Sequence, residues 1–410
     1  MYRVALLESE VSSLRDSSLS VPDSSDRRSI VSSSSSARRW DDPPEEPPPP
    51  NHPTTVPAPQ AGGSEVGNLT TMVFVKSVTA RRSYVAEVAA LQFTPNDTHL
   101  AAMFPRTVNV RTFFPDEPAT LVLVNVRDGS RLPTSLVSSH DVKVSGGFAF
   151  RPRGADLVVA CPYFVPGESL SSSSSASSGF GRVPRIEVYD CGRSVRWSKQ
   201  EVPMRAPVAF SPDGMTLAGV STRDPSRIVL ARFSKEMVAV RTMVIKHTDE
   251  VTRLAYLPDG TKLVSAGRDG YLRLTCLESG RTLKRIEVMG RAHASILEVA
   301  RDGTRVVSVW GRDVVVWDLG SGGVHTYNLD VIRGDGMSEG WPLAVSPDCR
   351  YLACRTEDGF DVSDVDTGKF RGDFATRGSV ITSAAFTKNG SKIAVGNYDG
   401  LIEIYDVITV

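Results

Sequence analysis

The sequence lacks the features that mark several large classes of protein. No apolar run approaches the roughly 18 residues of a membrane span, and charged residues interrupt the apolar ones near the first residue, so we expect no secretory signal. The five cysteines show no Cys-x-x-Cys spacing, so we expect neither a disulfide framework nor a thiolate metal site. Free thiols in a reduced compartment, cytoplasmic or nuclear, fit this composition. The cysteines are Cys161, Cys191, Cys276, Cys349 and Cys354.

Charge and catalytic motifs exclude further classes. Lys plus Arg equals Asp plus Glu at 47 each, so no net field favours nucleic acid or an anionic membrane. The sequence contains no Gly-x-Ser-x-Gly, no His-Glu-x-x-His and no phosphate-cradling Gly-x-x-x-x-Gly-Lys-Ser/Thr motif. We therefore expect no catalytic residues, no metal ion and no cofactor. The expected partners are proteins, with neither nucleic acid binding nor membrane insertion.

The first 68 residues differ in composition from the rest of the chain. Ser, Pro, Arg and acidic residues dominate in "SIVSSSSSARRWDDPPEEPPPPNHP", which has too little apolar surface to offset the entropy of ordering. We predict a disordered tail over residues 1–68, with a possible short helix at its start where apolar residues follow heptad spacing. Ser29 follows two arginines in "DRRSIVSS", which makes it a candidate phosphorylation site for a basophilic kinase.

One unit recurs seven times in the remaining chain. Each copy has an apolar strand, a tight turn and a second apolar strand, as in "VAFSPDGMTLAGV" and "LAYLPDGTKLVSA". Pro followed by Asp-Gly is typical of hairpin turns, in which Gly takes a positive φ angle. A third β-rich segment follows each copy, such as "YLRLTCL" or "DVVVWDL". The copies begin at Leu91, Phe148, Val208, Leu254, Leu297, Leu343 and Ala384.

The repeat resembles that of the WD-repeat family of β-propellers. The resemblance rests on the spacing of 41 to 46 residues between the last five copies, the Ser-Pro-Asp-Gly turns and the Trp317-Asp318 dipeptide, and it covers residues 69–410. It implies an all-β, seven-bladed propeller with four strands in each blade. The last copy stops at its third strand, and an unassigned strand, "TTMVFVKSV", precedes the first copy. We expect this N-terminal strand to close the ring by pairing with the last blade.

The resemblance also implies a structural network in each blade. Well-formed repeats brace the blade with a His, a Ser or Thr, an Asp and a Trp, but here the array is degenerate. Partial networks of this kind brace a blade less strongly than complete ones. The candidate members are His247, Ser265 and Asp269 in blade four, with Thr275 at the Trp position; Trp317 in blade five, with Gly311 at the Asp position; and Asp399 in blade seven, with Arg377 and Tyr405 at the His and Trp positions.

An Arg-Asp pair recurs between the second and third strands of blades three, four and five. Its arginines are Arg223, Arg268 and Arg312, and the resemblance places these turns on the face where the family usually meets partners. One interpretation is structural: each Arg pairs with its own Asp or caps the turn. The other is functional: an arginine crescent, extended by Arg355 and Arg377, binds an acidic or phosphorylated peptide through forked hydrogen bonds.

The expected function is therefore a non-catalytic scaffold for protein–protein interaction, acting as a monomeric propeller within a complex. Two alternatives remain open. A propeller enzyme would place His, Asp and Glu side chains together in the central channel. A phosphoinositide-binding propeller would carry paired arginines, whereas the segment "KFRGDF" has only one.

Overall fold

The fold is described from a computed structural model of the chain. The chain divides into two compact units, residues 1–64 and residues 65–410, and all described elements belong to the second. The predicted disordered tail, its short helix and the candidate site Ser29 lie outside the described residues. The structure describes residues 69–79, 87–104, 120–132, 136–137, 148–152, 158–165, 183–190, 195–196, 204–233, 238–243, 247–288, 293–329 and 341–409.

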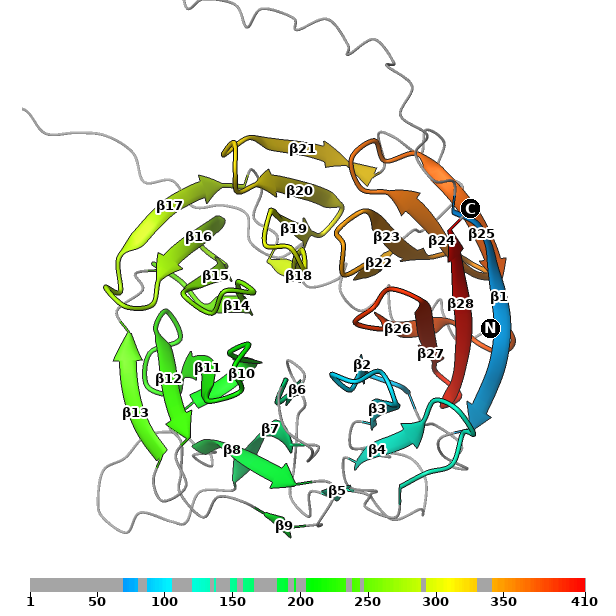
Figure 1. The fold of residues 1–410 in the computed structure, drawn as a ribbon, viewed down its shortest axis with the longest axis horizontal. Coiled ribbons are helices and arrows are strands. Elements are labelled where there is room, and N and C mark those ends of the chain that lie inside the picture. Colours follow the sequence, from blue (N-terminus) through cyan, green and yellow to red (C-terminus); the bar gives the residue numbers. More distant parts are fainter. Residues whose placement is uncertain are drawn as a thin grey trace, which may run out of the picture. The chain divides into compact units, whose positions relative to one another are not determined.

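The described strands form seven four-stranded antiparallel sheets around a central axis (Figure 1). This confirms the expected all-β propeller. We number the sheets as blades one to seven in the order of their first strands. In each blade the first strand lies nearest the axis and the fourth lies at the rim.

Each blade takes its strands as follows. Blade one contains β2 (Ala90–Phe93), β3 (His99–Phe104), β4 (Thr120–Asn125) and β5 (Leu136–Val137). Blade two contains β6 (Ala149–Phe150), β7 (Val158–Val165), β8 (Val183–Asp190) and β9 (Val195–Arg196). Blade three contains β10 (Met204–Phe210), β11 (Thr216–Ser221), β12 (Ile228–Phe233) and β13 (Val238–Met243). Blade four contains β14 (Val251–Tyr256), β15 (Lys262–Gly267), β16 (Tyr271–Cys276) and β17 (Thr282–Glu287).

The three remaining blades include the one that joins both ends of the propeller. Blade five contains β18 (Ala294–Val299), β19 (Arg305–Trp310), β20 (Asp313–Asp318) and β21 (Val324–Asn328). Blade six contains β22 (Trp341–Val345), β23 (Tyr351–Arg355), β24 (Gly359–Asp364) and β25 (Phe370–Ala375). Blade seven contains β26 (Ile381–Phe386), β27 (Lys392–Asn397), β28 (Leu401–Thr409) and β1 (Leu69–Thr79).

The ring closes through the N-terminal strand, as the sequence predicts. Strand β1 pairs antiparallel with β28, from Leu69 opposite Thr409 to Thr79 opposite Leu401. The first described residues of the propeller thus become the fourth strand of its last blade. This pairing covers the edge of β28, which would otherwise expose unpaired backbone N–H and C=O groups.

The hairpin turns explain why Pro-Asp-Gly recurs in the sequence. In blade four the backbone N–H of Gly260 donates to the carbonyl oxygen of Leu257 at 2.9 Å, and Gly260 has a φ angle of 71°. The carboxylate of Asp259 accepts the backbone N–H of Thr261 at 2.9 Å. The aspartate and the glycine of the motif therefore each have a physical role in turning the chain back onto itself.

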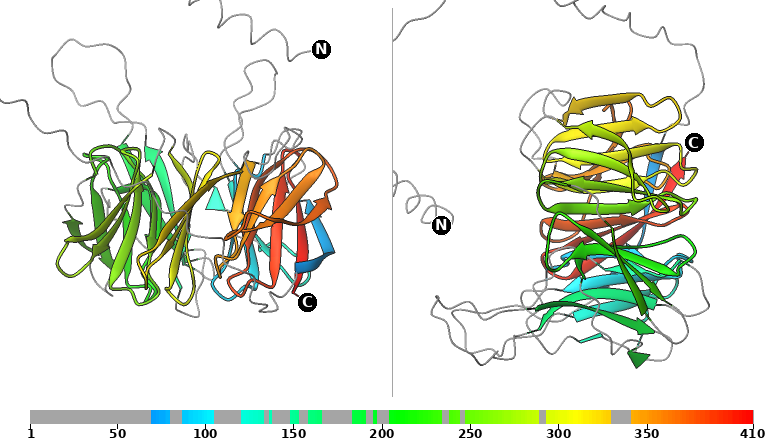
Figure 2. Two further views of the ribbon diagram at one scale, coloured as in Figure 1. Left: turned by 90° about the horizontal axis from the view of Figure 1, so that it is seen from above. Right: turned by 90° about the vertical axis from the view of Figure 1, so that its left-hand side faces the viewer.

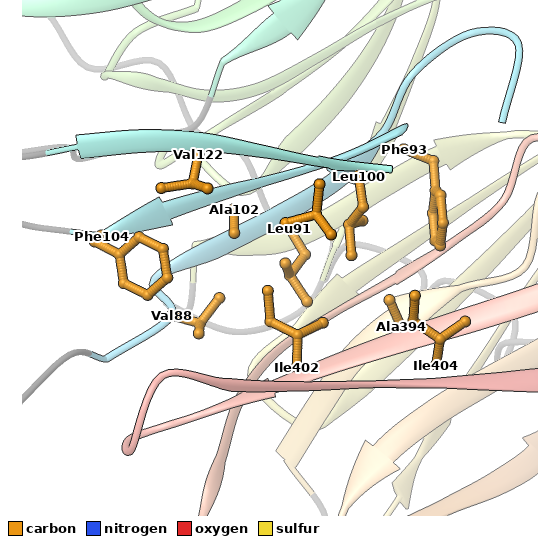
Figure 3. Packing of buried hydrophobic residues seen from close by; sticks show 11 residues of the cluster. Val88, Leu91, Phe93, Leu100, Ala102, Phe104, Val122, Ala394, Ile402 and Ile404 are labelled. Carbon is orange, nitrogen blue, oxygen red and sulfur yellow. The ribbon is translucent and has the colours of Figure 1, made fainter. Parts of the chain in front are cut away.

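The core lies between neighbouring blades, because strand side chains alternate between the two faces of each sheet. Leu91 and Leu100 of blade one face Ala394, Ile402 and Ile404 of blade seven (Figure 3). Side chains such as Leu100 and Ile402 are fully buried, and each contributes roughly 1.5–3 kcal/mol relative to an exposed position. The stability of one blade consequently depends on its two neighbours.

Strands run between two opposite faces of the ring, which Figure 2 shows from the side. We call the face that carries the turns between second and third strands, and the connections between blades, the loop face. We call the opposite face, which carries the turns between first and second strands, the hairpin face. The functional candidates divide between these two faces and the axis.

Candidate functional site

The three network residues expected in blade four lie in contact. His247 Nε2 lies 2.8 Å from Ser265 Oγ, and His247 Nδ1 lies 3.0 Å from Asp269 Oδ1. The other carboxylate oxygen of Asp269 accepts the backbone N–H of Thr248 at 2.9 Å and Arg273 Nη2 at 2.8 Å. Burial alone would raise the pKa of Asp269, but these hydrogen bonds outweigh it and hold the pKa well below its usual range.

Two neighbours of this network depart from the expected pattern. Thr275, at the Trp position, is fully buried, and its hydroxyl has no hydrogen-bond partner among the described residues. Arg273 is buried beside Asp269 and supplies a donor that the sequence analysis did not identify. Gly267 makes room for the histidine, because a Cβ atom at this position would lie 2.3 Å from His247 Nδ1.

Blade five uses different residues at the equivalent positions. Trp317 is buried, but its indole Nε1 has no hydrogen-bond partner among the described residues. The serine of this blade, Ser308, instead accepts a hydrogen bond from Trp310 Nε1 at 2.9 Å. Trp310 stands two residues after Ser308, as Gly267 stands two residues after Ser265. In the sequence, this different hydrogen bond is indicated by a tryptophan at the position where blade four requires glycine.

Blade seven keeps only part of the expected arrangement. Asp399 is exposed and accepts the backbone N–H of Ser379 at 3.1 Å, so it holds the connection between blades six and seven. The buried carboxylate is Glu403, which accepts the backbone N–H of Arg377 and the hydroxyl of Tyr405, both at 3.1 Å. Burial and the adjacent Glu403 both raise the pKa of Tyr405.

The aspartates of the three Arg-Asp turns have different partners. Asp224 forms an ion pair with Arg227 at 2.7 Å. Asp269 belongs to the buried network of blade four, and Asp313 accepts a hydrogen bond from Asn328 Nδ2 at 2.7 Å. The recurrence of aspartate therefore reflects three separate local structural roles.

The arginines of these turns lie on the loop face, where their surroundings also differ. Arg223 is exposed. Arg268 Nε lies 3.1 Å from a carboxylate oxygen of Glu250, whose other oxygen lies 2.9 Å from Arg205 Nη2. The guanidinium carbon of Arg312 lies 5.3 Å from the centre of the Trp341 ring, a cation–π contact between blades five and six.

The two further arginines of the expected crescent occupy unlike positions. Arg377 is exposed in the connection between blades six and seven. Arg355 does not lie in a turn: it is the last residue of β23, and its Nη1 donates to the carbonyl oxygen of Ile381 at 3.3 Å. Between and beside these arginines, three large apolar side chains are exposed on the loop face. They are Trp341 at 47%, Val380 at 45% and Tyr398 at 47%.

The first strands surround a cavity of about 730 Å³ at the hairpin-face end of the axis. Glu298 is the only acidic residue among the described residues that line it, and none of them is a histidine. This composition lacks the grouped His, Asp and Glu side chains that would favour a channel enzyme. Five blades each contribute one aromatic side chain to the wall: Phe93, Phe150, Phe210, Tyr256 and Phe386.

The described residues offer neither a membrane-spanning helix nor a cluster of metal ligands. None of the helices that they form is long and apolar enough to cross a membrane. The same residues contain no group of three or more His, Cys, Asp or Glu side chains able to hold a metal ion. Among the described residues, Cys276, Cys349 and Cys354 form no disulfide bond.

Comparison with known proteins gives matches that agree with this geometry. Residues 208–300 match the family model of the anaphase-promoting complex subunit 4 WD40 domain, and residues 367–406 match that of the WD domain, G-beta repeat. The WD repeat-containing protein SL1-17 of Schistosoma mansoni is 32% identical over 98 residues, which are 23% of this chain and 31% of that protein. The β-propeller domain of Myceliophteria thermophila Cps50 (Swd1) superposes with a TM-score of 0.60 at 14% identity, over 82% of this chain and all of that domain.

Proposed function

This chain is a β-propeller of the WD-repeat family, and we propose that it binds an acidic or phosphorylated protein partner on its loop face. Propellers of this family generally act as scaffolds for protein–protein interaction. The chain would act in the same way, without catalysis, as one propeller within a larger complex in the cytoplasm or nucleus. Its rigid blades would hold the partner-binding turns in fixed relative positions.

The contact between Arg312 and Trp341 carries the proposal. A tryptophan ring that is 47% exposed is costly in water, and here a guanidinium covers part of it. Trp, Tyr and Arg are the side chains that most often dominate the energy of a protein interface. Tyr398 adds a second exposed aromatic side chain in blade seven, and Arg223 adds an exposed cation in blade three.

These side chains define the chemistry of the partner. Each arginine can offer two parallel N–H donors to a carboxylate or phosphate, whereas the exposed aromatic rings favour an apolar contact. The partner segment would thus carry an apolar anchor next to a negatively charged group. Arg268 would contribute less than Arg223 and Arg312, because Glu250 already neutralises its charge.

Affinity purification from cell extract with three versions of the full chain tests the proposal. The first is the natural chain, the second carries Arg223→Glu, Arg268→Glu and Arg312→Glu, and the third carries Arg232→Glu, Arg281→Glu and Arg350→Glu. The three arginines of the control are exposed and lie away from the loop face. We expect a set of proteins that the natural chain and the control retain and that the loop-face variant loses. Retention of the same proteins by all three versions would refute the assignment.

Treatment of the extract with phosphatase separates the two kinds of partner. Loss of the retained set after treatment would identify phosphate as the recognised group. Its persistence would identify carboxylates. Both triple variants must show the melting temperature of the natural chain, since a loss of folding would explain any loss of binding.

A further inference from the structure

The axis of the propeller carries a second feature, on the first strands and independent of the loop face. Each first strand has one residue immediately before the aromatic or valine residue that it contributes to the cavity wall. In five of the seven blades this residue is alanine, and in blades one and five it is Gln92 and Glu298. The alanines are Ala149, Ala209, Ala255, Ala344 and Ala385, and the pairing of first with second strands aligns all seven. The fold itself therefore does not need a carboxylate at this position.

Glu298 lies in an environment that does not compensate its charge. Its half-buried side chain lines the cavity, and among the described residues none donates a hydrogen bond or forms an ion pair with the carboxylate. Burial raises the pKa of Glu298 to about 7. An uncompensated carboxylate at a cavity wall costs stability, which is typical of groups that are kept for binding.

The walls of the cavity favour a particular kind of ligand. Its volume of about 730 Å³ falls within the range of small-molecule sites. Aromatic side chains from blades one, two, three, four and seven line it, as do Ile296 and Val345. Such walls accept an apolar stem, and aromatic rings also attract cations. Among the described residues that line the cavity, Glu298 would then supply the single carboxylate.

The rim of the cavity further limits the charge that a ligand can carry. On the hairpin face, five blades place a proline at the start of the turn, but Arg301 and Lys388 stand at this position in blades five and seven. The guanidinium of Arg301 donates to the backbone oxygen of Lys388, and the backbone N–H of Lys388 donates to Asp97 at 2.7 Å. Two cations at the rim repel metal ions and polyamines. The same two cations repel a ligand that has a single positive charge on a neutral stem much less strongly.

From these observations we propose that the cavity binds one ammonium or guanidinium group on an apolar stem, with Glu298 as its counter-ion. The group can belong to a lysine or arginine side chain of a protein or to a small free amine. The site lies on the axis and shares no residue with the proposed interaction surface on the loop face. Its failure would therefore leave the proposed function intact.

The protonation of Glu298 gives the site a pH dependence. A carboxyl group of pKa about 7 is roughly 10% ionised at pH 6 and roughly 90% ionised at pH 8, so affinity for a cation should rise about tenfold over this interval. Of the other groups around it, Cys349 has a thiol whose pKa burial raises. The charged and titratable groups on the elements packed against Glu298 are Arg253, Tyr256, Arg301, Arg305, Cys349 and Lys388.

The test is a ligand-observed NMR titration of the full chain with two probes, n-butylguanidinium and Nα-acetyl-arginine amide. At pH 8 we expect binding of at least one probe to the natural chain, and at least tenfold weaker binding to Glu298→Gln. The matched control Glu287→Gln removes an exposed carboxylate from β17 and should bind as the natural chain does. Binding should weaken about tenfold on going from pH 8 to pH 6 in the natural chain.

The two probes distinguish the sources of the ligand. Stronger binding of the capped residue indicates a protein side chain, and stronger binding of n-butylguanidinium indicates a small free cation. Equal binding by the natural chain and Glu298→Gln, or no binding of either probe at pH 8, would overturn the proposal. The variant should fold, because alanine occupies the equivalent position in five blades.

Discussion

Replacing Gly267 by alanine tests the structural network of blade four with a single added methyl group. The new Cβ atom would lie 2.3 Å from His247 Nδ1 and 2.6 Å from Asp269 Oδ1, far inside van der Waals contact. Gly267 has no positive φ angle, so alanine causes no backbone strain there. The histidine must therefore move, and its hydrogen bonds to Ser265 and Asp269 are lost.

The magnitude follows from the groups that lose their partners. Ser265 and Asp269 are both shielded from water, and each buried polar group left without a partner costs roughly 1–3 kcal/mol. Asp269 keeps the bonds from Thr248 and Arg273, which limits its share. We expect Gly267→Ala to lower the free energy of unfolding by about 3 kcal/mol. The control Gly320→Ala should change it by less than about 0.5 kcal/mol, because a Cβ atom there meets only Asp318 Oδ1, at 3.5 Å.

A double-mutant cycle makes the reasoning refutable. His247→Ala alone removes the same two hydrogen bonds and should cost about the same. With the imidazole gone, the methyl group of Gly267→Ala meets only Asp269 Oδ1, at 2.6 Å, and that oxygen has lost its histidine partner and can shift. The double variant should therefore be little less stable than His247→Ala alone. The coupling free energy would then be about 3 kcal/mol, measured by urea unfolding followed by circular dichroism. Additive effects of the two substitutions would refute the steric explanation.

Three further predictions concern other parts of the propeller. Deleting residues 70–78 should prevent cooperative thermal unfolding, because the deletion uncovers the edge of β28. Deleting residues 1–66 should leave the melting temperature unchanged. Equal thermal unfolding of the two truncated chains would contradict the closure of the ring by β1. Trp310→Phe should lower the free energy of unfolding in urea by about 1 kcal/mol more than Trp317→Phe does. The reason is that Trp310 Nε1 donates a hydrogen bond to Ser308, whereas Trp317 Nε1 has no partner among the described residues. The reverse order would show that the hydrogen bond to Ser308 does not contribute to stability. Glu298→Gln should stabilise the chain at pH 8 by up to about 3 kcal/mol and have little effect at pH 5. The reason is that a raised carboxyl pKa makes the folded state lose stability as the pH rises from about 4.5 to 7. A gain in stability that is equal at both pH values would show that ionisation of Glu298 is not the cause.

The fold could be predicted from the sequence because its determinants are local. Each strand-turn-strand copy contains its own tight turn, which is Pro-Asp-Gly or a variant of it, and its own alternation of apolar residues. Seven copies could therefore be found without knowledge of tertiary contacts. The closure by β1 was also predictable, because the last copy lacked a fourth strand and one strand before the first copy had no assignment. Both inferences depend on spacing along the chain alone.

The side-chain contacts of the candidate site could not be predicted in the same way. The partners of Arg268 and Arg312 are Glu250 and Trp341, and neither lies next to its arginine in the sequence. Blade geometry brings each pair together through a connection between strands or blades, whose length and path vary. The exposure of Trp341 on the loop face likewise depends on how the neighbouring blade covers it. A repeated dipeptide therefore predicted the position of the turns correctly but said little about the partners of each side chain.

The degenerate network is better understood as a different local solution in each blade. Two residues after the serine position, blade four has Gly267, which leaves space for a histidine. Blade five has Trp310, which supplies its own donor to Ser308. Blade seven has Asn397, whose side-chain oxygen accepts the backbone N–H groups of Asp399 and Leu401 at 3.0 and 2.9 Å. From blade to blade, the residue at this position differs, and so do the polar groups that depend on it for space or for a hydrogen bond. A substitution that imports the residue of one blade into another should thus be destabilising, even though both residues occur at the same position of the same repeat.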